Sequence, residues 1–197
     1  MRRPAFTRIE CRPSGARFVL IIPARAYATG LSLCRAFAVW AAMSMGKHSS
    51  NIRAATIGDL PAIFVLERSS PTAAHWKESD YRTGIAQPER LVLVAEREAS
   101  IVGFLVALVA TEEWELENIA VSPAAFREGI GRALMNGLII RARQAQAAEI
   151  RQEIRASNTA AQKLGLSVGF IQGGRRRDYY QNPTEDALLF KYLLRES

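Results

Sequence analysis

The sequence predicts a mixed α/β domain from about residue 50 onward, with a largely antiparallel central sheet flanked by helices. Three β-rich runs follow one another and are joined by short polar turns, which is typical of an antiparallel meander. Segments with helical periodicity lie before and after these runs. The three runs are residues 91–95, 101–110 and 113–121.

The segment before the meander predicts a short strand and one or two helices. Residues 51–55 form the strand candidate. Asp59 is suited to cap the helix that follows, and Pro61 suits an early helical position. Apolar residues continue at helical spacing to about Thr83.

The segment after the meander predicts two helices and three strands. Pro123 ends the third β-rich run, and a loop leads into a helix over about residues 130–148. Ser157 and Asn158 are suited to cap a second helix that ends near Ser167. Strands are expected at residues 150–155, 171–180 and 187–194.

Basic charge is concentrated near the N-terminus. The chain carries a net charge of +7, but residues 1–42 hold seven arginines and one acid, so the rest is close to neutral. A nucleic-acid-binding domain carries its basic charge on the folded face that meets the phosphates. We therefore expect no direct nucleic-acid partner. The apolar runs are too short for a membrane span, so we expect no membrane association.

We interpret residues 1–45 as a basic extension that is either disordered or the product of a misassigned start. Met43 or Met45 would then be the first residue. An organellar transit peptide is the alternative interpretation of the same Arg-rich, acid-poor composition. Residues 50–197 are left as the functional domain, and their number suits one compact fold.

Metal-binding and thiol chemistry are not expected in this domain. Both cysteines, Cys11 and Cys34, lie before residue 43. The two histidines, His48 and His75, are far apart in the sequence and belong to no metal-ligand pattern. We predict no metal site.

A glycine turn after the third β-rich run is the clearest candidate for a binding site. Gly129 and Gly131 lie where a helix is expected to begin, and the first N–H groups of a helix have no intrahelical partner. The helix dipole favours anions there, and glycine lets the backbone approach a phosphate closely. Arg127 and Arg132 flank the turn and are suited to charge-assisted hydrogen bonds.

The residues of this turn alone leave three interpretations open. The first is a tight loop whose glycines only set backbone geometry. The second is a dinucleotide-binding fingerprint with Glu149 as the ribose-binding acid, although Leu134 stands where a third glycine is expected. The third is the pyrophosphate turn of the family described next. A P-loop is excluded, because no Gly-Lys-Ser/Thr follows the turn.

Two longer stretches resemble the GNAT superfamily of N-acetyltransferases. Residues 113–134 (EWELENIAVSPAAFREGIGRAL) resemble its motif A, and residues 152–170 (QEIRASNTAAQKLGLSVGF) resemble the strand and helix that follow. With the tail GRRRDYY…EDALLF, these stretches are most similar to RimI-type ribosomal-protein alanine N-acetyltransferases. The likeness covers about residues 50–194 and implies the GNAT fold.

The resemblance implies a site for acetyl-CoA. The pantetheine arm would bond to the backbone of Ile119, Ala120 and Val121 as an added strand would. Asn158 would also contact the cofactor. The turn that would hold the pyrophosphate consists of Arg127, Glu128, Gly129, Ile130, Gly131 and Arg132.

The resemblance also implies catalytic and acceptor-binding residues. Glu153 matches the family's general base, which accepts the proton of the amine directly or through one water. Without the resemblance, Glu153 would be interpreted as part of a solvated strand face. The residues expected to face the acceptor are Glu117, Asn118, Tyr179 and Tyr180.

Two positions depart from the family pattern. Phe126 stands three places before the first glycine of the turn, where the family commonly has Gln or Arg. Gly165 stands where RimI-type proteins usually have the tyrosine that protonates the leaving CoA thiolate. Because glycine has no proton to donate, we expect chemistry slowed by about 10²–10⁴-fold, with Tyr179 or Tyr180 as the candidate substitute.

We therefore predict a cytoplasmic N-acetyltransferase, a monomer or weak dimer, that uses acetyl-CoA to acetylate the N-terminal α-amine of a protein. A ribosomal protein is the expected acceptor. Two alternatives remain open. One is a related acetyltransferase acting on a small amine or a lysine. The other is a non-catalytic acetyl-CoA-binding module, which Phe126 and Gly165 motivate.

Overall fold

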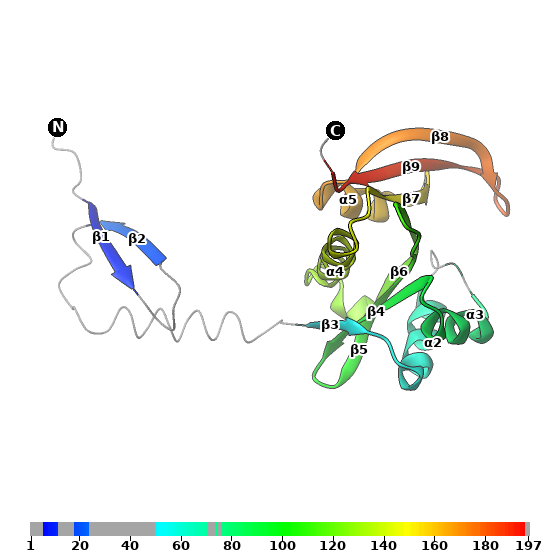
Figure 1. Ribbon diagram of the computed structural model, residues 1–197, viewed down its shortest axis with the longest axis horizontal. Helices are drawn as coiled ribbons and strands as arrows, with labels where there is room; N and C mark the ends of the chain where they lie inside the picture. The colour runs from blue at the N-terminus through cyan, green and yellow to red at the C-terminus, as the bar shows by residue number, and fades with distance from the viewer. Residues whose placement is uncertain (1–5, 12–17, 24–49, 71–73, 75, 196–197) are drawn as a thin grey trace. The chain divides into compact units, whose positions relative to one another are not determined.

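The chain divides into two units, residues 1–49 and residues 50–197. In the first unit, β1 (Phe6–Cys11) pairs antiparallel with β2 (Phe18–Pro23), a hairpin that the sequence did not predict. The rest of the proposed 1–45 extension lies outside the described residues, so that interpretation stays a prediction. The computed structural model describes residues 6–11, 18–23, 50–70, 74 and 76–195 (Figure 1).

The second unit is a seven-stranded sheet with helices on both faces (Figure 1). The strand order is β3-β4-β5-β6-β7-β9-β8, and every neighbouring pair is antiparallel except β6 and β7. This mixed, largely antiparallel sheet confirms the predicted fold class. The strands are β3 (Asn51–Ala54), β4 (Arg90–Arg97), β5 (Ser100–Leu108), β6 (Glu113–Val121), β7 (Glu149–Arg155), β8 (Ile171–Tyr180) and β9 (Glu185–Leu193).

Four α-helices and two short 3-10 turns complete the described part of this unit. Each of these helices is too short or too polar to cross a lipid bilayer. The elements are η2 (Ile57–Asp59), α2 (Leu60–Ser69), α3 (Glu78–Ala86), η3 (Pro123–Ala125), α4 (Ile130–Gln144) and α5 (Thr159–Ser167).

The expected elements are present, but some end at other residues. Helix α4 ends at Gln144, four residues before the predicted end, because Gln146 adopts a left-handed conformation with φ of 58°. The N–H of Ala147 then bonds to the carbonyl of Ala142 at 3.0 Å, which closes a Schellman motif. Strand β9 begins at Glu185, two residues before the predicted start.

Alternating side chains of the central strands build one core on each face of the sheet. Leu93 and Ala95 of β4 pack on the α4 side, whereas Val92 and Val94 pack on the side of α2 and α3. Because helices cover both faces, β4 and β5 are apolar at nearly every position instead of alternating with polar residues. This is why the first two runs of the meander were conspicuous in the sequence.

A β-bulge in β6 changes which face its side chains occupy. Leu116 pairs with Ala107 of β5, whereas Asn118 pairs with the adjacent Val106, so Glu117 is an additional residue. Leu116 belongs to the core beneath α4, and Ala120 after the bulge belongs to the core beneath α2. The bulge lies in the middle of the sheet, where β6 is about to leave β7.

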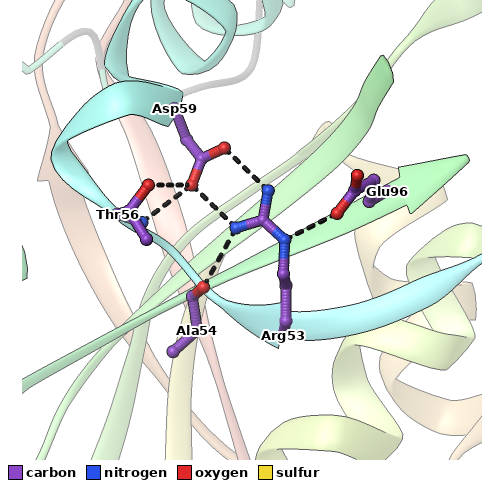
Figure 2. Close-up of polar contacts among 5 residues, drawn as sticks. All are labelled: Arg53, Ala54, Thr56, Asp59 and Glu96. Atoms are coloured by element: carbon purple, nitrogen blue, oxygen red, sulfur yellow. Dashed lines mark hydrogen bonds and ion pairs between the residues drawn. The ribbon is translucent and has the colours of Figure 1, made fainter. Parts of the chain in front are cut away.

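Arg53 of β3 ties the edge of the sheet to the start of α2 (Figure 2). Its guanidinium donates two hydrogen bonds of 2.8 Å to Asp59 and one of 2.6 Å to Glu96. The Asp59 carboxylate also accepts from the backbone N–H of Thr56 at 2.7 Å and from its hydroxyl at 2.9 Å. Asp59 therefore stands at the N-cap position of α2, as predicted, but its carboxylate serves Arg53 and η2.

These hydrogen bonds make the contribution of Asp59 to stability dependent on pH. The Arg53 guanidinium holds the pKa of the Asp59 carboxyl well below its ordinary value of 3.8. A carboxyl with a depressed pKa stabilises the fold above its ordinary pKa, and this stabilisation is lost as the pH falls toward the depressed value.

Asp59→Asn is expected to lower the free energy of unfolding by about 1–3 kcal/mol at neutral pH, because a neutral amide replaces a charged, multiply bonded acceptor. Urea unfolding followed by circular dichroism measures the change. The difference from the wild type should shrink as the pH falls below 3.8, where the unfolded wild-type carboxyl takes up a proton. A difference that is constant in acid contradicts this account.

The matched control removes a charge from an exposed ion pair. Glu78 and Arg82 lie four residues apart on α3, with the guanidinium 2.8 Å from the carboxylate and both side chains more than half exposed. Glu78→Gln should change the free energy of unfolding by less than about 0.5 kcal/mol.

Candidate active site

The candidate site lies where β6 and β7 separate. Their parallel pairing runs only from Glu113 opposite Glu149 to Leu116 opposite Gln152. Beyond these residues β6 continues along β5, and β7 continues along β9. A cavity of about 790 Å³ opens between the two separated halves.

The separated half of β6 presents backbone groups to this cavity. The N–H of Ser122 donates to the carbonyl of Val102 in the β5 strand at 2.8 Å. Backbone groups alternate in direction along a strand, so Ala120 also faces β5, while Ile119 and Val121 face the opposite, open edge. All three residues of the predicted cofactor strand line the cavity. An extended ligand is able to pair with this edge as an added strand.

The glycine turn continues from β6 and begins helix α4. Gly129 has a left-handed φ of 85°, and a Cβ placed on it would meet nothing within 4 Å. The first hydrogen bond of the helix runs from the N–H of Ala133 to the carbonyl of Gly129 at 2.9 Å. The N–H groups of Ile130, Gly131 and Arg132 precede that bond and are placed to bind an anion.

The second glycine of the turn has a different role. A Cβ on Gly131 would lie 3.0 Å from Cδ2 of Leu164, so the missing side chain allows α5 to pack closely against α4. The role of Gly131 at the phosphate stays a prediction, and the structure adds this helix–helix contact to it. Only Gly129 combines a left-handed backbone with open space beside it.

An ion pair controls the charge of the turn. Arg97 of β4 pairs with the carboxylate of Glu128, and each side chain is about one quarter exposed. An unpaired carboxylate here would repel a phosphate, and Arg97 neutralises it. Arg127 and Arg132 are exposed, and Arg127 is left-handed with φ of 64°. Arg97 was missed in the sequence because it is far from the turn along the chain.

Glu153 stands in the wall of the cavity on β7. Its carboxylate lies 2.6 Å from Nη1 of Arg176, and its side chain is 18% exposed. A hydrogen bond to the same carboxylate raises the pKa of Tyr179. The Tyr180 hydroxyl donates to the backbone carbonyl of Glu153 at 3.3 Å, and burial raises the pKa of Tyr180. The β8 strand thus surrounds Glu153 with one guanidinium and two phenols.

Glu115 is a second carboxyl close to Glu153. Both line a neighbouring groove of about 330 Å³ on the sheet, together with Arg176. Glu115 is exposed, but partial loss of hydration raises the pKa of its carboxyl, and the nearby charges of Glu153 and Glu117 raise it further. A carboxyl with a raised pKa is a rival candidate for proton transfer, which the sequence did not single out.

The predicted acceptor-binding acid Glu117 lines the cavity, but its charge is compensated. Arg90 of β4 donates to both oxygens of the Glu117 carboxylate, at 3.0 and 3.1 Å. The Arg90 guanidinium also lies over the ring of Trp76, 4.9 Å from its centroid. Glu117 is therefore a fixed part of the cavity wall, and its negative charge is neutralised by Arg90.

The two predicted asparagines are held by different elements. Asn158 caps α5, as predicted, with its side-chain oxygen accepting from the N–H of Ala161 at 3.1 Å, and it also borders the cavity. Asn118 is 5% exposed and hydrogen-bonds to Glu67 and Tyr81 beneath the sheet. Its side chain supports the cavity wall from behind.

The two positions that depart from the family pattern lie in contrasting surroundings. Phe126 is 59% exposed beside the turn. Gly165 is buried in α5, and a Cβ there would lie 3.7 Å from both Oε1 of Gln152 and Cβ of Phe170. Oε1 of Gln152 has no hydrogen-bond partner within the described residues.

The cavity brings together about half of the predicted site residues. Tyr179 and the turn residues 127–132 lie outside its lining. His48 and His75 lie outside the described residues, and the described residues contain no group of three or more potential metal ligands. The predicted residues in the lining are Glu117, Asn118, Ile119, Ala120, Val121, Glu153, Asn158 and Tyr180.

Comparison with known proteins gives consistent results. The Acetyltransferase (GNAT) family profile matches residues 60–170. The ribosomal protein bS18-alanine N-acetyltransferase of Escherichia coli K12 is 37% identical over 129 residues, which are 65% of this chain and 84% of that protein.

Two solved structures share the fold. The ribosomal-protein-S18-alanine N-acetyltransferase of Escherichia coli superimposes with a TM-score of 0.67 at 30% identity, covering 76% of this chain and 96% of that one. The structure of yncA from Salmonella typhimurium with its cofactor acetyl-CoA gives a TM-score of 0.65 at 20% identity, covering 76% and 96%.

The effect of Gly131→Ala on stability is expected to depend on the residue at position 164. In the wild-type background the new methyl group meets Leu164 at 3.0 Å, which offsets the gain of up to about 1 kcal/mol that alanine has over glycine in a helix. In a Leu164→Ala background the gain should appear as increased stability. A double-mutant cycle measured by urea unfolding gives the coupling.

Gly129→Ala is the control in the same turn. It should destabilise the fold by about 1–2 kcal/mol in both backgrounds, because the left-handed backbone strains any residue with a Cβ. Equal effects of Gly131→Ala in the two backgrounds would disprove the assigned contact with Leu164.

Proposed function

Because the chain belongs to the GNAT family of acetyltransferases, we propose that it transfers the acetyl group of acetyl-CoA to the α-amine at the N-terminus of a protein. The proposed acceptor is a ribosomal protein. The observation that carries this proposal is the position of Glu153, a carboxylate in the wall of a cavity that runs along the open edge of β6.

Features of this chain fit acetyl-CoA. The open backbone groups of Ile119 and Val121 suit the amide-rich pantetheine arm, which pairs as a strand does. The free N–H groups at the start of α4 suit the pyrophosphate, with open space at Gly129 and exposed guanidinium groups at Arg127 and Arg132. When bound, acetyl-CoA supplies the acetyl group as a thioester that an uncharged amine attacks.

In this proposal Glu153 is the general base. An amine is protonated near neutral pH and becomes a nucleophile only after it loses that proton. The Glu153 carboxylate accepts the proton directly or through one water. Nη1 of Arg176 lies 2.6 Å from the same carboxylate. Because the Arg176 side chain is 54% exposed, it is free to turn toward solvent when a cationic amine binds. Tyr180 keeps its proton at neutral pH and is the candidate donor to the leaving thiolate.

The acceptor class rests on the relatives and on the open side of the cavity. The similar Escherichia coli enzyme is named for the alanine of ribosomal protein bS18. In this chain, the acceptor side is bordered by Tyr180, by Asn182 and Pro183 between β8 and β9, and by Glu185 at the start of β9. A chain terminus is able to enter there in extended form. The location that we propose together with this acceptor is the cytoplasm.

Glu153→Gln is expected to lower kcat by about 10²–10⁴-fold, because glutamine fills the same space but accepts no proton at neutral pH. Release of CoA thiol from acetyl-CoA, with a panel of peptides that begin with alanine or serine, measures the rate. Free polyamines and aminoglycosides complete the panel. The matched control is Glu115→Gln on the adjacent strand, which should leave kcat nearly unchanged.

Each other outcome would support a different assignment of the base, the acceptor or the function. If kcat falls by about 10²–10⁴-fold in Glu115→Gln and does not fall in Glu153→Gln, Glu115 is the general base. Turnover of polyamines but not of peptides would contradict a protein N-terminus as acceptor. Calorimetric binding of acetyl-CoA without thiol release on any acceptor would indicate a binding module.

A further inference from the structure

A carboxylate is buried behind the acceptor side of the cavity. Glu67 of α2 is 2% exposed, within the apolar core between α2, α3 and the sheet. Its Oε1 accepts three hydrogen bonds from three separate parts of the chain. The Tyr81 hydroxyl of α3 donates at 2.6 Å, the backbone N–H of Trp76 at 3.0 Å, and Nδ2 of Asn118 in β6 at 3.2 Å.

Asn118 extends this network toward the cavity. Its Nδ2 also donates to the Tyr81 hydroxyl at 2.9 Å, and its Oδ1 accepts from the backbone N–H of Ala74 at 3.4 Å. Asn118 and Ala74 both line the cavity, as does Ser70 at the end of α2. The network therefore joins the connection between α2 and α3 to the strand that bears the open edge.

The network acts at the bulge in β6. Asn118 directly follows the extra residue Glu117 and directly precedes Ile119, whose backbone faces the cavity. Its side-chain amide nitrogen donates to Glu67 and to the Tyr81 hydroxyl, and these hydrogen bonds fix the direction of the strand where it leaves β7.

Packing alone does not account for Glu67. The surrounding core is made of residues such as Leu60, Ile63 and Leu66, and an apolar side chain at position 67 would avoid the cost of removing a carboxyl group from water. A buried carboxylate that collects three donors fixes their relative positions, which an apolar side chain does not do.

We propose that Glu67 is a positioning residue that holds the acceptor-side wall of the cavity at Ala74 and Asn118, together with the adjacent Trp76, in the geometry that receives the amine. This inference rests on the proposed function and deepens it. Glu67 acts through these three residues and not on the reacting atoms. The open edge at Val121 and the turn at Gly129 lie outside its hydrogen-bonded network, so only the acetyl-CoA contact at Ile119 adjoins the network and most of the cofactor contacts do not depend on it.

The test compares Glu67→Leu, which removes the acceptor atom, with Glu67→Gln, which retains an oxygen at the same place. Steady-state kinetics on an alanine-initiated peptide give the KM for the peptide, the KM for acetyl-CoA and kcat. Glu67→Leu should raise the KM for the peptide by about 10–100-fold, since a displaced wall misplaces the acceptor. The KM of Glu67→Leu for acetyl-CoA should stay within about twofold of the wild-type value. Glu67→Gln should keep the KM for the peptide close to that of the wild type.

Ile63→Ala is the matched control for lost stability. It removes a fully buried side chain from the same helix and the same core, but it makes no hydrogen bond to the wall. Tyr81→Phe is a milder variant that removes one of the three donors and leaves the other two, in case Glu67→Leu fails to fold. If Ile63→Ala raises the KM for the peptide as much as Glu67→Leu does, or if the KM for acetyl-CoA rises in parallel in Glu67→Leu, the proposal is overturned.

A second measurement requires no turnover. Amide hydrogen exchange of the wild type and of Glu67→Leu reports directly on the Trp76 N–H, which should exchange about tenfold faster or more in the variant once its acceptor is gone. Unchanged exchange at Trp76 would overturn the positioning role whether or not the protein is an enzyme. Faster exchange in a protein that acetylates no peptide would leave the positioning role intact and would count against the proposed function alone.

Discussion

The candidate site depends on the early end of one strand pairing. Hydrogen bonding between β6 and β7 stops at Leu116 and Gln152, so backbone groups in the middle of a sheet are left for a ligand. Unpaired backbone groups inside a protein are costly, and a complete sheet would pair them. The bulge at Glu117 turns β6 away from β7, helices on both faces hold the strands, and Asn118 is bonded from behind by Glu67. The packing and hydrogen bonds of the fold therefore hold the two strands apart.

Three acids around the site are each paired with an arginine from another element. The pairing at the glycine turn prevents a carboxylate from repelling a phosphate, and the pairing on β6 fixes part of the cavity wall. The pairing on β7 is different, because its arginine is more than half exposed and the carboxylate is the proposed base. Glu115 lies among these pairs without an arginine partner of its own in the described residues. Loss of hydration, followed by the charges of Glu153 and Glu117, raises its pKa. The three pairs are Arg97–Glu128, Arg90–Glu117 and Arg176–Glu153.

Local patterns in the sequence predicted the elements, and contacts across the sheet decided the rest. Apolar periodicity and the Asn158 cap predicted the meander and α5, because these signals depend on neighbours along the chain. The Schellman motif that ends α4 depends on a left-handed Gln146, which no residue preference indicates. The packing contact of Gly131 was not predicted, because its partner Leu164 lies on another helix. Glu67 resembled an ordinary polar position of an amphipathic helix, since its three donors come from distant segments.

Amide hydrogen exchange along β6, with and without acetyl-CoA, tests the central claim most directly. The account predicts that saturating acetyl-CoA slows exchange at Ile119 and Val121, whose N–H groups face the open edge, by about tenfold or more. Exchange at Ala120, whose N–H faces β5, should change little. Equal exchange at Ile119 and Val121 in the free and saturated protein would contradict the account, because acetyl-CoA would then bind somewhere other than the gap between β6 and β7.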